Sequence, residues 1–299
     1  MRVATIDVGT NTILLLIAEG PPAKVLADRS RIVRLGQDVD RTGALQPAAI
    51  ERALAVLREY AAEARACDAS LLAVGTQALR EVSNADAFLQ PARAILGCPV
   101  EVVDGQREAE LAWRAVRGSF PELSDAIVMD VGGGSTELVV ARGGRVLQKV
   151  SLKIGSVRLH ERFLTHDPPT DDEMAQVGQA IDRELRALAL PRGLPLVGIA
   201  GTVTTLAAMH AGIDPYDGER VHGMTLERAA VARQIERLRL LPLAERRQLR
   251  GLEPARADVI LAGALIVAHV LSETGAPALR VSDRGVRWGL LYERLEGKV

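Results

Sequence analysis

The stretch IDVGTNT, residues 6–12, lies between two apolar runs, and a similar stretch, MDVGGGST, recurs at residues 129–136. When the two copies are aligned on their aspartates, Gly9 falls on Gly132, two positions after the aspartate. Thr12 falls on Ser135, so that both copies have a hydroxyl residue three positions further on. Each copy has an apolar strand, a turn of small residues and a second apolar strand, which is the pattern of a β-hairpin. The repeat therefore predicts two similar halves, each opening with a hairpin whose first strand ends at an aspartate.

The residues after the first hairpin alternate between strand and helix patterns. A helix is expected to begin near Pro47, a favoured residue in a first helical turn, because apolar residues recur at helical spacing as far as residue 61. The other expected elements are a third strand at 23–35, strands at 71–74 and 100–103, and helices at 85–95 and 106–116. The first half is thus predicted to have the order βββαβαβα.

The second half repeats the three opening strands, expected at 126–130, 136–141 and 145–152. The segment TDDE at residues 170–173 is a capping box that opens a helix. Further elements are expected at 196–200 and 279–281 (strands), at 202–211, 226–238 and 256–272 (helices), and in a last helix. The segment GSFPELS, residues 118–124, is the natural boundary. We expect an α/β fold of two domains, 1–121 and 122–299, related by duplication and flanking a cleft, with the final helix free to pack back on the first domain.

Composition excludes several classes of protein. The 299 residues include 48% hydrophobic and 25% charged residues with a net charge of −1, which argues against broad nucleic-acid binding. Cys67 and Cys98 form no CxxC pair, and the five histidines have no metal-ligand spacing. The longest apolar run, residues 259–271, is too short to span a bilayer, and the N-terminus lacks the features of a signal peptide. We therefore expect a cytoplasmic protein with no membrane and no nucleic-acid partner.

The repeated turns predict an anion site. Turns rich in Gly, Ser and Thr leave backbone amides directed at open space, where they can bind phosphate oxygens. An aspartate at the strand end supplies an oxygen ligand for Mg²⁺, usually through water. Plain hairpin turns are the alternative, but two equivalent copies argue against it. The expected magnesium ligands are Asp7 and Asp130, and the expected phosphate ligands are Thr10, Asn11, Gly133, Gly134 and Ser135.

A third turn of small residues, GTVTT at residues 201–205, follows the strand expected at 196–200 and opens a helix. The N-terminus of a helix is another favourable anion site, which makes Gly201 and Thr202 candidate substrate ligands. The alternative is that one of these two residues only caps the helix.

Five segments in order make the chain resemble a known family: DVGTNT at 7–12, GTQALR at 75–80, GQREA at 105–109, DVGGGSTE at 130–137 and GTVTT at 201–205. Together they are similar to the exopolyphosphatase/guanosine pentaphosphatase (Ppx/GppA) family of the actin-like ATPase superfold, which has two ribonuclease H-like domains. The resemblance extends to residues 282–289 and fits the short, two-domain form without a C-terminal HD-type domain. Arg107 departs from the acidic residue frequent in relatives, which is expected to alter cation binding or substrate preference. Ala200 replaces a frequent glycine, which is expected to matter little.

The resemblance implies roles for individual residues. Glu108 is the implied base that orients and deprotonates water, Arg80 the implied phosphate-binding cation, and Mg²⁺ the implied cofactor, with Mn²⁺ as the alternative. Glu110 is expected to face another direction. Glu137 follows the second turn and is expected to assist water or metal, although a strand glutamate facing solvent is the alternative. For Arg284 and Arg287 we expect no role beyond guiding a long anion.

The sequence therefore predicts an exopolyphosphatase that removes terminal phosphates from polyphosphate, with removal of the 5′ γ-phosphate of guanosine pentaphosphate (pppGpp) as the alternative within the same chemistry. Two alternatives of other classes remain: an actin-like nucleotide-binding protein or small-molecule kinase, and a non-catalytic regulator that binds the alarmone. The combination of residues 105–108 with Arg80 argues against a kinase. Twofold self-association is common in the family and makes a homodimer the expected assembly.

Overall fold

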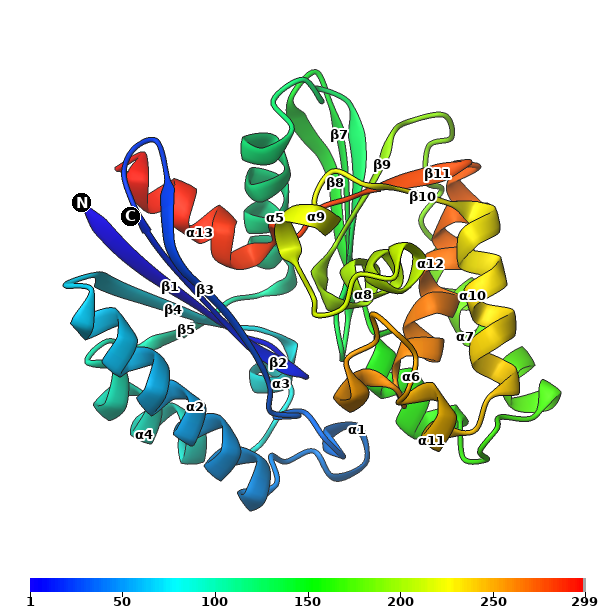
Figure 1. The fold of residues 1–299 in the computed structure, drawn as a ribbon, viewed down its shortest axis with the longest axis horizontal. Coiled ribbons are helices and arrows are strands. Elements are labelled where there is room, and N and C mark those ends of the chain that lie inside the picture. The colour runs from blue at the N-terminus through cyan, green and yellow to red at the C-terminus, as the bar shows by residue number, and fades with distance from the viewer. Residues whose placement is uncertain (298–299) are drawn as a thin grey trace. The chain divides into compact units, whose positions relative to one another are not determined.

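The computed structural model describes residues 1–297. The chain divides into two compact units, the first comprising residues 1–118 with the last helix and the second comprising residues 119–285 (Figure 1). Each unit is built on one β-sheet covered by helices. In the part of the chain that the structure describes, no helix is long and apolar enough to cross a membrane.

The sheet of the first unit has the strand order β3-β2-β1-β4-β5. Apolar residues of β1 and β2 alternate between the two faces of this sheet, so that Ile6 and Leu15 pack on one face and Val3 and Leu16 on the other. The strands are β1 (Arg2–Val8), β2 (Thr12–Glu19), β3 (Lys24–Ile32), β4 (Ser70–Gly75) and β5 (Val100–Val102).

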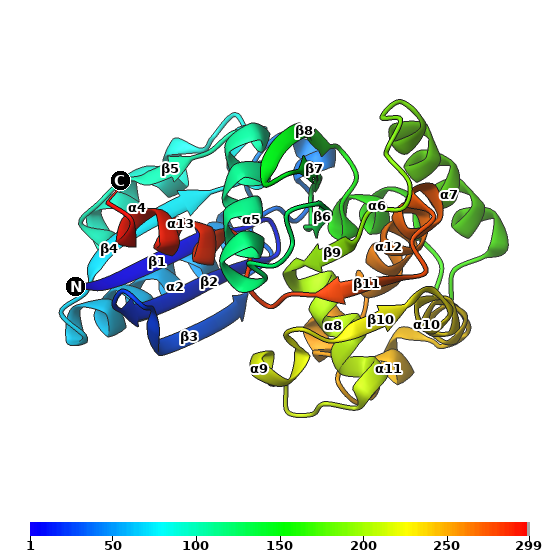
Figure 2. The same cartoon turned by 90° about the horizontal axis from the view of Figure 1, so that it is seen from above.

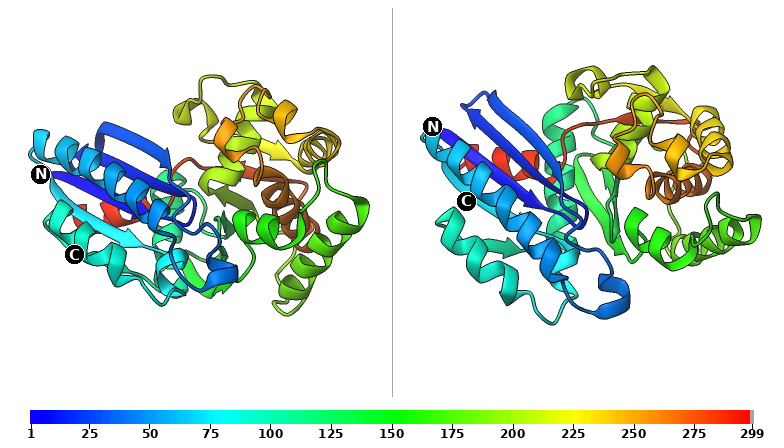
Figure 3. Two further views of the ribbon diagram at one scale, coloured as in Figure 1. Left: turned by 90° about the horizontal axis from the view of Figure 1, so that it is seen from below. Right: turned by 60° about the horizontal axis from the view of Figure 1, so that its bottom comes forward.

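Helices cover both faces of this first sheet. The long helices α2 (Pro47–Ala66) and α4 (Asp86–Leu96) pack side by side on one face (Figure 3). The other face is covered by α5 (Gly105–Ser119) and by α13 (Val286–Leu295), which packs on β1 and β2. The short helices α1 (Val39–Thr42) and α3 (Gln77–Arg80) complete the unit.

The sheet of the second unit has the order β10-β11-β9-β6-β7-β8. The helix α12 (Ile260–Thr274) is apolar on nearly every side and contacts α6, α7, α8 and α10 (Figure 2). The strands are β6 (Ala126–Val131), β7 (Thr136–Arg142), β8 (Arg145–Leu152), β9 (Leu196–Ile199), β10 (Thr225–Glu227) and β11 (Ala278–Val281). The other helices are α6 (Ser156–Phe163), α7 (Asp171–Arg186), α8 (Ala200–Ala211), α9 (Gly218–Val221), α10 (Arg228–Leu240) and α11 (Leu243–Arg246), with a 3₁₀ turn at Pro254–Arg256.

The two units repeat one topology. Strand order β3-β2-β1-β4-β5 in the first corresponds to β8-β7-β6-β9-β11 in the second, with the same antiparallel hairpin and parallel crossover. Even the register shift is repeated, at Ile17/Ala18 in the first unit and at Val140/Ala141 in the second. The predicted α/β fold of two ribonuclease H-like units of the actin-like ATPase superfold is therefore confirmed.

Most of the predicted elements are present, including the capping box at Thr170. The third strand ends at Ile32 because the next two amides, of Val33 and Arg34, turn to donate to the carbonyl of Asn11. The helix expected from Leu226 begins at Arg228, since residues 225–227 pair with β11 as an edge strand. The short helices α1, α3, α9 and α11 were not foreseen, because a single turn has too few residues to show a period.

Candidate functional site

The turn between β1 and β2 is fixed by backbone hydrogen bonds on both sides. The amide of Gly9 donates to the carbonyl of Thr12 at 3.0 Å, and the amide of Gly36 donates to the carbonyl of Thr10 at 2.8 Å. A Cβ on Gly36 would lie 2.3 Å from Cγ2 of Thr10, so only glycine permits this approach. The Thr10 hydroxyl donates to Oε1 of Gln77 at 3.1 Å, which ties the turn to α3. The turn is thus held rigidly before any ligand arrives.

The turn between β6 and β7 repeats this arrangement with other partners. The amide of Gly132 donates to the carbonyl of Ser135 at 3.0 Å, as Gly9 does to Thr12. The carbonyl of Gly133 accepts from the amides of Val157 and Arg158, at 2.8 and 3.1 Å, at the start of α6. A Cβ on the preceding Gly155 would lie 2.4 Å from that carbonyl oxygen, so the glycine allows α6 to approach the turn. The carbonyls of this turn therefore face α6.

The amides at the tips of both turns remain available. Within residues 1–297, the backbone N–H groups of Thr10, Asn11, Gly133 and Gly134 donate to no acceptor. Two adjacent free amides in each turn form the concave donor set that binds an anion. The four residues predicted as phosphate ligands from the sequence thus have the donors that this role needs.

Two buried polar side chains of the first turn lack partners. Among the described residues, Oδ1 of Asp7 and both amide atoms of Asn11 are buried without a hydrogen bond. Buried polar atoms in this condition call for an explanation, such as a bound water, ion or substrate group. No group of three or more His, Cys, Asp or Glu residues in the described chain could enclose a metal ion. This donor set fits Mg²⁺, which takes one or two carboxylates and completes its shell with water and phosphate oxygens.

The carboxyl group of Asp7 has an unusual acidity. Its pKa is raised to about 7, first by burial and then by the charge of the nearby Glu108, while the charge of Arg287 lowers it. Arg287 comes from α13, where Nη2 donates to both carboxylate oxygens of Asp28 at 3.0 Å. The expectation that Arg287 would only guide a long anion is wrong, because this arginine is buried beside β1. Arg284 acts elsewhere, in the second unit. Burial lowers the pKa of His222, and the charge of Arg284 lowers it further.

Glu108 is buried in the first turn of α5 and paired with Arg80. Nη1 of Arg80 donates to Oε2 of Glu108 at 2.7 Å and to the carbonyl of Val103 at 2.8 Å. Burial raises the pKa of Glu108, and the charge and hydrogen bond of Arg80 oppose this effect. Glu110 is exposed and lies 3.8 Å from Arg107, so it faces another direction, as predicted. The two residues implied as base and cation are therefore in direct contact.

Arg107 has a structural partner. Its guanidinium donates to both carboxylate oxygens of Glu293 on α13, at 2.6 and 3.0 Å, and Nε of Arg114 lies 3.5 Å from the same carboxylate. The observed contacts of Arg107 therefore fasten α5 to α13, and they do not support the expectation that this residue alters cation binding.

Glu137 lies beside Asp130 in the second sheet. The two are direct cross-strand partners on β6 and β7, and Ser151 of β8 is the next partner in the same row. Glu137 is only 1% exposed, which rules out a strand glutamate facing solvent. Its Oε1 accepts from the hydroxyl of Ser135 at 2.8 Å and from that of Ser151 at 2.6 Å. The participation of Ser151 was not foreseen from the sequence.

The third turn joins β9 to α8. The Thr202 hydroxyl donates to the carbonyl of Val131 at 3.1 Å, and thus ties α8 to the end of β6, with no side-chain cap on the helix. Gly201 is covered by the guanidinium of Arg256, whose Nη1 would lie 2.4 Å from a Cβ at that position. Arg256 is half-buried, and desolvation lowers the pKa of its guanidinium. This arginine precedes a long apolar helix, and no motif in the sequence identified it.

Ala200 departs from the glycine frequent in relatives, and its backbone is strained. Its φ is +68°, in the left-handed region that favours glycine. The expectation that this departure matters little is therefore wrong for stability. Ala200→Gly is expected to raise the free energy of unfolding by about 0.5–1 kcal/mol, since removing a left-handed strain of about 1–2 kcal/mol outweighs the greater entropy of unfolded glycine.

Urea unfolding measures this effect, and Ala55→Gly is the matched control. Ala55 is exposed inside α2, where glycine is expected to cost about 1 kcal/mol. A loss of stability in both variants would show that Ala200 is not strained in solution.

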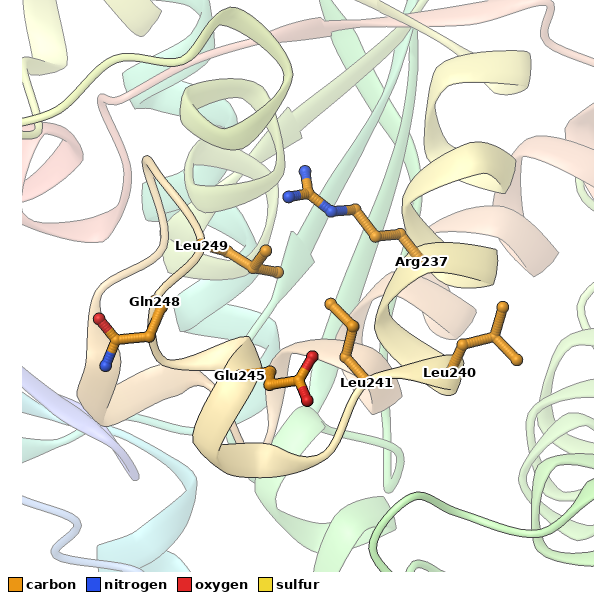
Figure 4. A pocket seen from close by; sticks show the side chains of 6 residues that line it. All are labelled: Arg237, Leu240, Leu241, Glu245, Gln248 and Leu249. Carbon is orange, nitrogen blue, oxygen red and sulfur yellow. The ribbon is translucent and has the colours of Figure 1, made fainter.

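The hollow of about 440 Å³ shown in Figure 4 lies elsewhere, between the end of α10 and α11. It is lined by Leu240, Leu241 and Leu249 with three polar residues, and none of the predicted site residues borders it. The candidate site is thus defined by the turns and by the carboxylates beside them.

Comparison with known proteins agrees with this geometry. Residues 16–298 match the Ppx/GppA phosphatase family. The chain is 37% identical to Exopolyphosphatase 2 of Mycobacterium tuberculosis, over 97% of each chain. The crystal structure of the Aquifex aeolicus member of the Ppx/GppA family is similar with a TM-score of 0.85 and 36% identity, covering 100% of this chain and 98% of that one. An exopolyphosphatase of Cytophaga hutchinsonii is similar with a TM-score of 0.90 and 30% identity, covering 99% and 98%. The chain therefore belongs to the Ppx/GppA phosphatase family, a family of hydrolases that act on phosphoanhydride bonds.

Proposed function

We propose that this enzyme is an exopolyphosphatase, which hydrolyses the terminal phosphate of inorganic polyphosphate with a divalent cation and a water activated by Glu108. The observation that carries the proposal is the repeated pair of free amides at 10–11 and 133–134, each pair following a strand whose next-to-last residue is a buried aspartate. A polyphosphate chain offers the many equivalent oxygens that such donors accept.

In this proposal the turn of each unit is a phosphate-binding element. The amides of the turns hold phosphate oxygens, Arg80 adds positive charge, and Gly201 and Thr202 border the anion at the start of α8. Asp7 and Asp130 would hold Mg²⁺ through water, with Mn²⁺ as the alternative. When bound, the cation would neutralise charge on the phosphate oxygens.

Glu108 is proposed to act as the general base. The water oxygen forms a bond to the terminal phosphorus, the water proton moves to the Glu108 carboxylate, and the shortened polyphosphate leaves with the electron pair of the broken P–O bond. Burial favours this role because it raises the pKa of Glu108 toward that of a proton acceptor at neutral pH. The charge and the hydrogen bond of Arg80 favour the ionised carboxylate and oppose this rise in the pKa of Glu108.

Phosphate release from polyphosphates of graded length and from pppGpp tests the proposal. Release from polyphosphate at a higher kcat/KM than from pppGpp is the expected result, and the reverse would make the enzyme a pppGpp 5′-phosphohydrolase. Transfer of phosphate from ATP to an added sugar or acetate would favour a kinase. Binding of the alarmone without release from any substrate would leave a non-catalytic regulator.

Asp130→Ala is expected to abolish the magnesium-dependent part of this activity while the chain remains folded. The physical reason is that Asp130 is the next-to-last residue of β6, beside the second turn, where its carboxylate is the oxygen ligand proposed for the cation. Titrating Mg²⁺ against phosphate release measures the effect. Asp172→Ala, an exposed change in the first turn of α7, is the control and should retain wild-type magnesium dependence. Equal behaviour of the two variants would contradict the metal assignment.

The assembly and the compartment belong to the same proposal: a homodimer in the cytoplasm. Light scattering of the purified protein measures its mass in solution and so tests whether it is a dimer.

A further inference from the structure

The carboxylate of Glu137 is held by two hydroxyl groups from different parts of the second unit. Ser135 belongs to the turn between β6 and β7, and Ser151 belongs to β8, where it is the direct cross-strand partner of Glu137. Both hydroxyls donate to the same oxygen, Oε1, at 2.8 and 2.6 Å. Hydrogen bonds to an ionised carboxylate are the stronger kind, so this pair fixes the orientation of the side chain.

The neighbouring hydroxyl groups are committed to backbone carbonyls. Thr136 donates to the carbonyl of Ile154 at 2.6 Å, and Thr202 donates to the carbonyl of Val131 at 3.1 Å. Their protons are therefore used in holding β8 and α8 in place. Ser135 and Ser151 donate to the Glu137 carboxylate instead.

Ser135 has a competing acceptor if the proposed function is correct. A serine hydroxyl has one proton to donate, and a phosphate oxygen, like a carboxylate oxygen, only accepts. Ser135 follows directly on the free amides of Gly133 and Gly134, so a phosphate bound there would compete with Glu137 for its proton. Ser151 lies on β8, outside the turn, and has no such competitor.

We propose that Ser151 is a positioning residue for Glu137. In the loaded enzyme Ser135 transfers its hydrogen bond from Glu137 to a phosphate oxygen, and the hydrogen bond from Ser151 continues to hold the carboxylate beside Asp130. The two serines thus have different tasks, since Ser135 contributes to binding and Ser151 to turnover. This inference rests on the proposed function, because it assigns phosphate to the second turn.

The test is steady-state kinetics on the full-length enzyme with the polyphosphate that it hydrolyses best. Ser151→Ala is expected to lower kcat about tenfold and to leave KM within about twofold, as loss of one charge-assisted hydrogen bond predicts. Ser135→Ala is expected to raise KM about tenfold instead, since it removes a contact to substrate. Ser151→Thr should restore kcat, because threonine keeps the hydroxyl and suits a strand. Gln148→Ala on the same strand, which removes a side chain that donates to the carbonyl of Leu188, is the control and should leave both constants unchanged.

A double-mutant cycle shows whether Ser151 acts through Glu137. In the Glu137→Ala background, Ser151→Ala should change kcat by less than about twofold, because the group that it orients is gone. The inference would be overturned if the losses of kcat from Ser151→Ala and Glu137→Ala multiplied in the double variant. A raised KM with unchanged kcat for Ser151→Ala would also overturn it. Failure of the proposed function looks different, since the wild-type enzyme would then release no phosphate from polyphosphate or would act on pppGpp at a higher kcat/KM. If the proposed function fails, the same double-mutant cycle can be measured on the free energy of unfolding. Additive effects of Ser151→Ala and Glu137→Ala in that cycle would also overturn the inference.

Discussion

Glu108→Gln is expected to lower kcat for phosphate release by about 10²- to 10⁴-fold, the range typical of a lost general base, and to leave KM within a few-fold. Glutamine preserves the size of the side chain and its hydrogen bond to Arg80, but it cannot take a proton from water. The buried environment of Glu108 makes this loss specific, since the neighbouring carboxylate on α5, that of Glu110, is exposed and faces another direction. Single-turnover release of phosphate measures the chemical step directly.

Glu110→Gln is the matched control for this prediction. Glu110 lies two residues further along α5 and is exposed, so its replacement should retain more than half of the wild-type kcat. Equal losses in the two variants would mean that the helix, and not the Glu108 carboxylate, is the sensitive feature. A Glu108 variant that keeps wild-type kcat would remove the assignment of this residue as base.

The two hairpins could be predicted from the sequence because their signals are local. Each depends on a short apolar strand, a turn of small residues and a second strand, and the chain carries this pattern twice. The register of the aspartates followed from the same pattern, since Asp7 and Asp130 end their strands at equivalent positions. The free amides at the turn tips are a consequence of that geometry.

The residues missed by the sequence analysis all act over long separations. Arg287 reaches the end of β1 only because α13 returns to pack on that strand. Ser151 meets Glu137 only through the pairing of β7 with β8, and Arg256 meets Gly201 only through the packing that brings the 3₁₀ turn to α8. Such contacts are set by tertiary packing, whereas a sequence motif predicts only the structure of the residues next to it in the chain.

One element lacked even a local signal. The helix α6 begins at Ser156 without a side-chain cap, because the amides of its first turn donate to carbonyls of the glycine turn at 132–133. A helix whose start is satisfied by another segment shows no capping residue in its own sequence. The same contacts orient the turn, so the unforeseen helix is part of the candidate site.

Asp7→Asn is expected to stabilise the metal-free protein at high pH at the expense of activity. The folded chain keeps a proton on Asp7 up to a pKa of about 7, whereas the unfolded chain releases it near 3.8. Between these pH values the folded state binds more protons than the unfolded state, so the contribution of Asp7 to the free energy of unfolding falls as pH rises. Above pH 7 the full cost of burying the ionised carboxylate is present. A shift of this size corresponds to at most about 4 kcal/mol, which asparagine would remove.

Urea unfolding of both proteins at pH 4 and pH 8 measures this difference. The variant should exceed the wild type by a few kcal/mol at pH 8 and by little at pH 4, where Asp7 is protonated in the folded chain and about half protonated in the unfolded one. Magnesium should narrow the gap at pH 8, because a cation that binds the ionised carboxylate stabilises only the wild type. Asp172→Asn, an exposed change, should show no such dependence on pH. If the difference in the free energy of unfolding between wild type and Asp7→Asn were the same at both pH values, Asp7 would be ionised in the folded protein. The proposal that burial destabilises the ionised Asp7 carboxylate in the absence of a cation would then lose its support.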